Sequence, residues 1–553
     1  MTPNATFGTI CGVAVVVSFQ LVLLDPLHET MDLPVWDESN QMAWGADFAE
    51  GSGTLGELAA SPLYNLAYAV LAGAFGRVAS VFAMKYLVTV LVALALWLML
   101  DRSSPHVAPP LWVAVLWVAT VPNLDGSLLV YHFGLALFIA ATAAGRDHPP
   151  LALVLLALCS LARLEFLLPL VAYGGALAVR RWRRGGRAPA GRPRSLGLAA
   201  CGVLLALAAY TAVHVDGWDV GGKRAWHAFG QHYAVAEREA GRTSVNPWVD
   251  YHLIVRRDFG GSTSTAEAAR ANPAAFARHT ATNLRRMPGA ARSLATPLHF
   301  DRLRPAWVLV ACWLLLPVVV ALGSLRRLSS AVAARARMLG DRGLIAGLGA
   351  LATLPCLVVR PKPIYLFPLV PLAGLTLVVL VSASWETVSS RSLRRVLAAG
   401  TVVLTLGVAG LTLAAGRPYD RPSRVRPVLD KVARLERLWP DSRHTLVGVG
   451  ASSYANYLGR RRCTAIEPFA TVAGGAGAGV RVTLGSLVAD HDPDAILINS
   501  LLVDSAQFDR ASLRMLNPAE WRPVAFGDEL LLLRTRTADS PDERRADGVE
   551  PTG

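Results

Sequence analysis

Two adjacent carboxylates, Asp37 and Glu38, lie in segment 35–39, just after the first long apolar run of the chain. A carboxylate within hydrogen-bond reach of a hydroxyl can act as a general base, and two close carboxylates raise one another's pKa. Two adjacent carboxylates in a loop can also be ordinary charged side chains that are exposed to water and have no chemical role. The position of the pair relative to a membrane and to other charges therefore decides its interpretation.

Basic and phenolic side chains at the edges of apolar runs are the second group with chemical potential. This group consists of Lys85, Arg163, Arg360, Lys362 and Tyr365. Cations and hydroxyl donors can stabilise the charge that develops on a leaving phosphate. Each of these cations also has a simpler interpretation, because Lys and Arg side chains anchor helix ends at the membrane interface, and Arg163 has Glu165 as a nearby partner.

The composition indicates which elements must position these side chains. Of the 553 residues, 53% are hydrophobic and 17% are charged, and the mean hydropathy is +0.40. Apolar runs have about the length that a helix needs to cross ~30 Å of hydrocarbon, and they predict a polytopic α-helical membrane protein with about 11 crossings. The first run, 7–24, lacks a small-residue cleavage site and is expected to stay as a helix. The block 151–179 is expected to form either a tight hairpin or one broken helix.

The distribution of arginine predicts the orientation. Short loops rich in Lys and Arg stay in the cytoplasm, and such clusters occur at 180–194, 326–342 and 391–395. With a cytoplasmic N-terminus, this places 25–77, 214–305 and 416–553 outside. The Ala, Arg and Gly usage is typical of a high-GC bacterium, so the inner membrane is the expected location. Lipid headgroups and topology explain the net charge of +14, and we expect no nucleic-acid partner.

Four regions follow from this pattern. Residues 1–415 are predicted to form the transmembrane module, with a first outer loop at 25–77 and a large outer loop at 214–305. Residues 416–540 are predicted to form a small extracytoplasmic α/β domain, with strands at 445–450, 494–499 and 529–533 and helices at 425–438 and 505–516. The acidic tail at 541–553 is expected to be disordered. Gly448 and Gly450 are interpreted as a strand-to-helix turn, because the other residues of a phosphate-binding loop are missing.

The order of these features resembles that of the GT-C glycosyltransferases, in particular the protein O-mannosyltransferase and aminoarabinose-transferase branch. The likeness covers most of residues 1–415. It rests on the acidic pair in the first outer loop, on Pro62, Leu63 and Tyr64 at the entry to the following amphipathic helix, and on a basic residue at position 85. It also rests on the arginine-containing turn 161–165 and on segment 360–371, with basic residues, a tyrosine and four prolines.

The resemblance implies an integral membrane enzyme that moves a sugar from a polyprenyl-phosphate donor to a glycan, lipid or protein outside the cytoplasm. Asp37 is then expected to act as the base of an inverting reaction, with Glu38 in support. Lys85, Arg163, Arg360, Lys362 and Tyr365 are expected to bind the lipid phosphate of the donor. The membrane lipids are further partners.

Two questions stay open at the level of sequence. Some relatives use a divalent cation, which is therefore possible here, but two carboxylates supply fewer ligands than such an ion usually takes, so we expect no obligatory metal. A transporter or flippase for lipid-linked glycans is the alternative function. Clear internal repeats and mid-membrane charges, which would favour transport, are not found.

Overall fold

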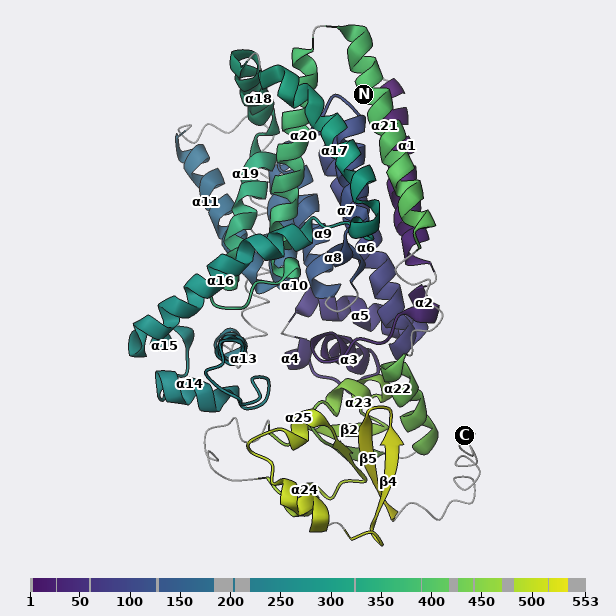
Figure 1. Ribbon diagram of the computed structural model, residues 1–553, viewed down its shortest axis with the longest axis vertical. Coiled ribbons are helices and arrows are strands. Elements are labelled where there is room, and N and C mark those ends of the chain that lie inside the picture. Colours follow the sequence, from purple (N-terminus) through teal and green to yellow (C-terminus); the bar gives the residue numbers. More distant parts are fainter. Residues whose placement is uncertain are drawn as a thin grey trace.

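The computed structural model describes residues 3–25, 27–58, 61–125, 129–183, 202–203, 219–322, 325–388, 390–416, 426–440, 443–469, 482–515 and 517–535. Within these residues the helices form an elongated bundle, and a small sheet lies beyond one end of it (Figure 1). The structure thus has the predicted helical membrane module and the predicted C-terminal α/β unit. The expected tail at 541–553 and, apart from 202–203, the expected crossing at 196–213 lie outside the described residues.

Within the described ranges, five helical segments are long and apolar enough to cross a membrane. They are Phe7–Thr30, Arg77–Asp101, Phe300–Val319, Pro363–Thr387 and Arg391–Ala414. Shorter apolar helices accompany them, and large apolar side chains such as Val403 and Val319 are exposed on the bundle, as expected for a surface that faces lipid tails. The chain is therefore a multi-pass membrane protein, and the count of 11 crossings stays a prediction.

The first half of the bundle consists of α1 (Pro3–Leu24), α2 (Leu27–Thr30), α3 (Asp37–Ala49), α4 (Leu55–Leu58), α5 (Pro62–Phe75), α6 (Arg77–Asp101), α7 (Ala108–Val118), α8 (Val121–Leu124), α9 (Leu129–Ala144), α10 (Pro149–Ala162), η1 (Leu164–Phe166) and α11 (Leu167–Arg183). The block 151–179 forms two helices. The backbone of Arg163 is extended (φ −148°, ψ 119°), and Pro169 follows in the first turn of α11, where proline is tolerated. Leu156 of α10 and Leu170 of α11 belong to one buried cluster, so the two helices pack as a hairpin.

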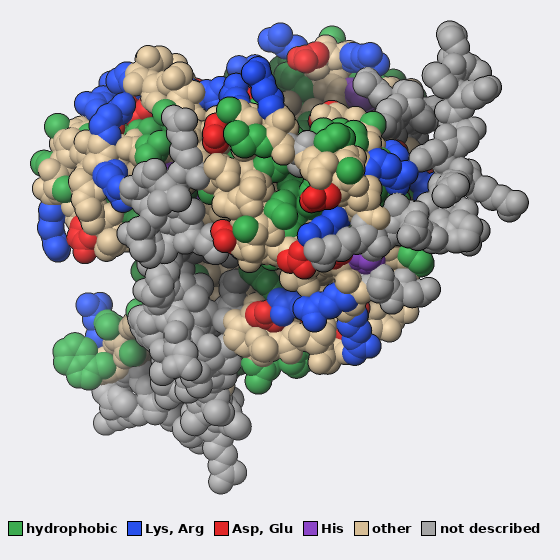
Figure 2. All heavy atoms as spheres, turned by 90° about the horizontal axis from the view of Figure 1, so that it is seen from below, with side chains coloured by type: hydrophobic (Ala, Val, Ile, Leu, Met, Phe, Trp, Pro, Cys, Tyr) green, Lys and Arg blue, Asp and Glu red, His purple; other side chains and the backbone are tan. Residues whose placement is uncertain are grey.

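The large loop folds into a helical lobe beside the bundle. It contains α13 (Asp219–Glu239), α14 (Tyr251–Phe259), α15 (Thr265–Ala271) and α16 (Pro273–Leu294). The helical stretches expected at 264–270 and 273–284 are present, each begun by a capping side chain, Ser264 and Asn272. Figure 2, seen from the end that carries the sheet, shows Lys and Arg side chains gathered on the left, where this lobe lies in Figure 1.

The bundle continues with α17 (Phe300–Leu322), α18 (Leu325–Leu339), α19 (Asp341–Leu348), η3 (Gly349–Leu357), η4 (Pro363–Leu369), α20 (Val370–Thr387) and α21 (Arg391–Ala414). Helix α18 lies at the end of the bundle farthest from the sheet (Figure 1). Its exposed arginines, Arg326, Arg327 and Arg337, therefore lie at the opposite end from the acidic pair.

The C-terminal unit contains α22 (Pro427–Leu438), β1 (His444–Val447), α23 (Ser452–Leu458), β2 (Cys463–Ile466), α24 (Leu484–His491), β3 (Ala495–Ile498), α25 (Ser500–Val503), η6 (Arg510–Met515), β4 (Trp521–Phe526) and β5 (Glu529–Arg534). The strand order is β2-β1-β3-β5-β4. Strands β1, β2 and β3 are parallel, with Val447 opposite Ile466 and Ile496, whereas β5 is antiparallel to β3 and β4. The three strands expected from the sequence are present, while β2 and β4 were not expected.

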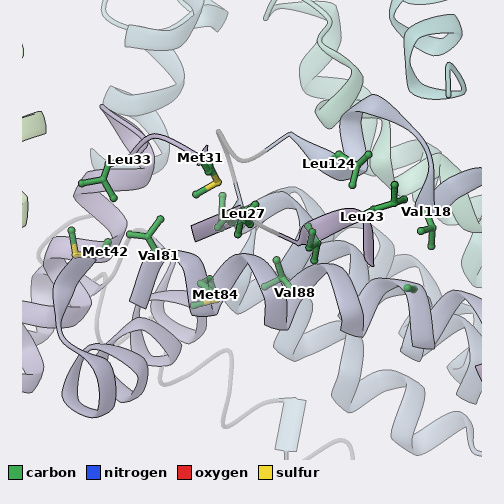
Figure 3. Close-up of a cluster of buried hydrophobic side chains, with 14 of the residues drawn as sticks. Leu23, Leu27, Met31, Leu33, Met42, Val81, Met84, Val88, Val118 and Leu124 are labelled. Atoms are coloured by element: carbon green, nitrogen blue, oxygen red, sulfur yellow. The ribbon is translucent and has the colours of Figure 1, made fainter. Parts of the chain in front are cut away.

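A buried cluster fixes the start of the chain against α6 (Figure 3). Leu23, Leu27 and Met31 from α1, α2 and the following loop lie with Met84 and Val88 of α6, and all five are at most 7% exposed. Asp32 extends this attachment to the C-terminal unit, because its carboxylate accepts the backbone N–H groups of Val428 and Leu429 at 3.0 Å. The loop before the acidic pair is therefore held by the bundle and by α22.

The two neighbouring residues Leu530 and Leu531 provide a test of the core of the sheet. Leu531 is fully buried opposite Leu497 and Val524, whereas Leu530 is 36% exposed. We expect Leu531→Ala to lower the free energy of unfolding of the C-terminal unit by about 2–5 kcal/mol and Leu530→Ala by less than about 1 kcal/mol. Thermal unfolding of the full-length protein in detergent measures the difference, and equal shifts for the two variants would contradict this assignment of faces.

Candidate functional site

The acidic pair forms the start of α3, and its two carboxylates face different surroundings. Asp37 is exposed, whereas Glu38 is fully buried. The preceding Trp36 has φ 61° and ψ −121°, a backbone region that costs a residue other than glycine about 1–3 kcal/mol. Asp37 and Glu38 follow this turn as the first two residues of α3, where successive side chains point about 100° apart, so one acid faces solvent and the other enters the protein.

Glu38 accepts three hydrogen bonds from two elements. Its Oε1 accepts the hydroxyl hydrogens of Tyr64 and, at 2.7 Å, of Tyr68, both on α5, and its Oε2 accepts the backbone N–H of Leu129 at 2.9 Å, at the start of α9. Burial raises the pKa of Glu38 to about 7, although the three hydrogen bonds act in the opposite direction. Glu38 thus attaches the first turn of α3 to α5 and α9 and is not available to solvent.

Asp37 interacts electrostatically with segment 360–371, which is predicted to bind the donor. It interacts electrostatically with Lys362 and with Tyr365, and Lys362 also interacts with Asp125. Lys362 and Tyr365 are half-buried and flank the start of η4, whose first residue is Pro363. Asp37 thus interacts at the level of charge with a segment more than 300 residues away in the chain.

Arg163 is linked to Tyr365 through the side chain of Tyr131. Its guanidinium lies 3.9 Å from the ring centre of Tyr131 and donates a hydrogen bond of 2.6 Å to the Tyr131 hydroxyl. The rings of Tyr131 and Tyr365 are 5.3 Å apart, and a side-chain hydrogen bond links them. Arg163 also pairs with Glu165 at 2.9 Å, as the simpler interpretation expected. The ion pair of the simpler interpretation is therefore present, and contact of Arg163 with a donor phosphate stays a prediction.

Lys85 and Arg360 have other partners in this structure. Lys85 is fully buried, and its Nζ donates to the carbonyl oxygens of Asn123 at 3.0 Å and of Asp125 at 2.6 Å, so it supports the end of α8. Arg360 is 40% exposed and pairs with Glu239 of α13, which connects the helical lobe to the late segment. The assignment of these two cations to the donor phosphate stays a prediction.

Three tyrosines of the site, Tyr64, Tyr68 and Tyr131, have no role that the sequence alone predicts. Tyr64 enters the sequence pattern only through the motif at 62–64. The spacing of Tyr64 and Tyr68 is the signal that sequence contains, because residues four apart share a face of a helix and an aromatic hydroxyl on a buried face needs a polar partner. Nothing in the sequence pairs Tyr131 with Arg163.

A metal site has limited support in the described residues. Within them, no three His, Cys, Asp or Glu side chains gather in a group that could hold an ion. The carboxylate of Glu38 already accepts three hydrogen bonds, which leaves Asp37 as the exposed member of the pair. His132, buried on α9, has its Nε2 3.1 Å from the carbonyl oxygen of Pro122 and serves the packing of α8.

Among known proteins, similarity to this chain is found at the level of solved structures. No protein-family model and no curated protein matches the sequence. Among solved structures, the crystal structure of ArnT from Cupriavidus metallidurans in the apo state is similar at 15% identity, covering 96% of this chain and 98% of that chain, with a TM-score of 0.38.

The buried position of Glu38 predicts a dependence of stability on pH. Because burial raises the pKa of Glu38 from 4.5 to about 7, the folded chain binds more protons than the unfolded chain in this interval, and stability falls as the pH rises through it. Glu38→Gln keeps an acceptor oxygen for the tyrosines but does not titrate. We expect the wild type to lose about 3 kcal/mol more than Glu38→Gln between about pH 5 and about pH 8.

Thermal unfolding of both proteins in detergent at these pH values measures the difference in slope. Glu29→Gln, which replaces a largely exposed acid of the same loop, is the matched control. Its stability should depend on pH in the same way as that of the wild type. Parallel curves for the wild type and Glu38→Gln would show that Glu38 does not titrate in this interval.

Proposed function

We propose that the chain is a membrane glycosyltransferase of the GT-C type, which transfers a sugar from a polyprenyl-phosphate donor to a hydroxyl group of an extracytoplasmic acceptor. The observation that carries this proposal is the exposed carboxylate of Asp37 in the field of Lys362 and Tyr365 at one end of a multi-pass bundle. The reaction needs a carboxylate for the acceptor proton and a cation for the leaving phosphate. A donor anchored in the membrane can reach both.

In the proposed reaction, the acceptor oxygen forms a bond to the anomeric carbon while the bond from that carbon to the phosphate oxygen breaks. Asp37 takes the proton of the acceptor hydroxyl, and the electron pair of the broken bond leaves with the phosphate, which stays on the lipid. Attack on the face opposite the phosphate inverts the configuration of the sugar. Glu38 holds the turn that carries Asp37, through its hydrogen bonds to α5 and α9.

Lys362 and Tyr365 are the proposed first contacts of the donor phosphate. Arg163 adds positive charge behind them, because its guanidinium bonds to Tyr131, which bonds to Tyr365. Arg360 supports this segment from the helical lobe, and Lys85 supports the loop of Asp125. Since these cations can meet the phosphate charge, we propose no obligatory metal.

The proposed location is the inner membrane of a bacterium, with the site on the extracytoplasmic side. The exposed arginines of α18, at the end of the bundle opposite the acidic pair, support this orientation by the positive-inside rule. The N-terminus then lies in the cytoplasm, and the C-terminal unit lies outside. The helical lobe and the C-terminal unit flank the acidic loop and are proposed to shape the acceptor site.

Removal of the proposed base gives the first test of function. A general base contributes about 10²–10⁴ in rate, so Asp37→Asn should lower kcat by this factor in folded protein. Release of undecaprenyl phosphate from a panel of synthetic undecaprenyl-phosphate-linked pentoses and hexoses, with isolated cell envelope as the acceptor, measures turnover. Glu29→Gln is the control and should stay within about twofold. Full activity of Asp37→Asn would exclude Asp37 as the base.

The two basic residues of the late segment should differ in their effect on donor binding. A hydrogen bond to a charged group contributes about 1.5–3 kcal/mol, so Lys362→Met should raise KM for the donor by about 10- to 100-fold. Arg360→Met should change it by less than about threefold, since this exposed guanidinium already pairs with Glu239. The same panel of donors measures both values, and a larger effect for Arg360→Met would assign the phosphate to Arg360.

A further inference from the structure

Trp36, directly before the proposed base, has a backbone conformation that usually belongs to glycine. Its φ of 61° and ψ of −121° bring the Cβ of any L-residue into close contact with its own backbone. Such a conformation persists only where the surroundings hold it. The contacts that hold Trp36 therefore also determine the direction in which Asp37 leaves the turn.

Beside the bonds that its carbonyl oxygen accepts from Ser39 and Asn40 within α3, Trp36 has two contacts with the C-terminal unit. The backbone N–H of Trp36 donates to the Oγ of Ser453 at 3.0 Å, across 417 positions of sequence. The indole ring lies against Gly450, where a Cβ would come within 2.9 Å of the ring. Gly450 itself has φ +81°, so both the conformation and the close approach require glycine there.

Further bonds attach the loop to α23 on both sides of Trp36. The hydroxyl of Tyr457 donates to the carbonyl oxygen of Pro34, and Nδ2 of Asn456 donates to Oδ1 of Asn40 at 2.7 Å. The residues before and after the turn are thus bound to the same short helix. The turn cannot move relative to α23 without breaking these bonds.

The sheet fixes the position of Ser453. Glu467, which follows β2, is half-buried and accepts the N–H groups of Gly450 at 2.9 Å and Ser452 at 3.2 Å, together with the Ser452 hydroxyl at 2.8 Å. Since β1 and β2 are parallel neighbours, Glu467 and the turn after β1 lie at the same edge of the sheet. In sheets of this type ligands usually bind beyond this edge, and here the edge meets the loop of Trp36.

We propose that Ser453 and Gly450 are positioning residues of the reaction, which set the place of the Asp37 carboxylate through the backbone of Trp36. This inference rests on the proposed role of Asp37 as the base. The C-terminal unit is then part of the catalytic centre. Ser453 contacts the acidic loop, whereas Lys362 and Tyr365 meet the donor, so loss of Ser453 should affect kcat and leave the KM for the donor unchanged.

The adjacent serines of α23 provide a matched pair of variants. Ser453→Ala removes the acceptor of the Trp36 N–H, and we expect kcat to fall by about 10- to 100-fold with the KM for the undecaprenyl-phosphate-linked sugar within about twofold. Ser452→Ala removes one of the three bonds to Glu467 and leaves the two backbone bonds that hold the turn after β1, so kcat should stay within about threefold. Thermal unfolding in detergent checks that both variants are folded.

Substitution of Trp36 tests the backbone directly. Glycine adopts the observed conformation without steric cost and alanine does not, so Trp36→Gly should have a kcat about tenfold above that of Trp36→Ala. Adding Ser453→Ala to Trp36→Gly should cost less than Ser453→Ala alone, because the two changes act on one turn. Equal activity of the Gly and Ala variants would show that the backbone conformation of Trp36 does not affect turnover, and would overturn the proposal.

A measurement without substrate separates this inference from the proposed function. Amide hydrogen exchange in residues 31–40 should become faster in Ser453→Ala and stay unchanged in Ser452→Ala. Unchanged exchange, or a wild-type kcat for Ser453→Ala, overturns the positioning role even when Asp37→Asn is inactive. Full activity of Asp37→Asn overturns the proposed base, and the exchange result then still reports whether Ser453 holds the turn.

Discussion

The geometry of the site depends on the burial of one carboxylate. Glu38 leaves water and accepts hydrogen bonds from two tyrosines of α5 and from the backbone at the start of α9. Burying an acid is costly unless donors surround it, so these donors and the acid require one another. The neighbouring Asp37 stays exposed and interacts electrostatically with Lys362 and Tyr365. The different surroundings of the two adjacent acids thus go together with the three hydrogen bonds of Glu38.

The sequence predicted the parts of the structure that depend on local pattern. Long apolar runs predicted the membrane helices, and short apolar runs predicted the central strands β1, β3 and β5. Strand β2 was missed because its four residues include Cys463 and Thr464 beside a run of arginines, and β4 was missed because Pro523 interrupts it. Contacts between segments that are far apart in the chain leave no pattern in the local sequence. The bond from Arg163 to Tyr131 and the burial of Lys85 under two carbonyl groups therefore became visible only in three dimensions.

The basic side chains of this molecule fall into two groups, which differ in the acidic residues that lie next to them. Arg77 and Arg460 converge on Asp47, and Arg460 also reaches Glu57, so ion pairs join the first loop to the C-terminal unit. Arg360 and Arg286 share Glu239 in the helical lobe. The charge of each of these arginines is balanced by its acidic partner, and the ion pairs hold neighbouring elements together. Lys362 differs from them because its acidic neighbours, Asp37 and Asp125, belong to the site itself.

The contact between Trp36 and Ser453 has a consequence for how the protein is made. Ribosomes add residues in order, and the loop of Trp36 emerges long before Ser453, 417 positions later, has been synthesised. During that interval the turn lacks the partner that holds it, while the membrane helices between them are inserted one after another. A nascent chain can therefore insert its membrane helices before the turn at Trp36 has the partner that holds it. The first loop reaches its final arrangement only when the last fifth of the protein has been made and has folded against it.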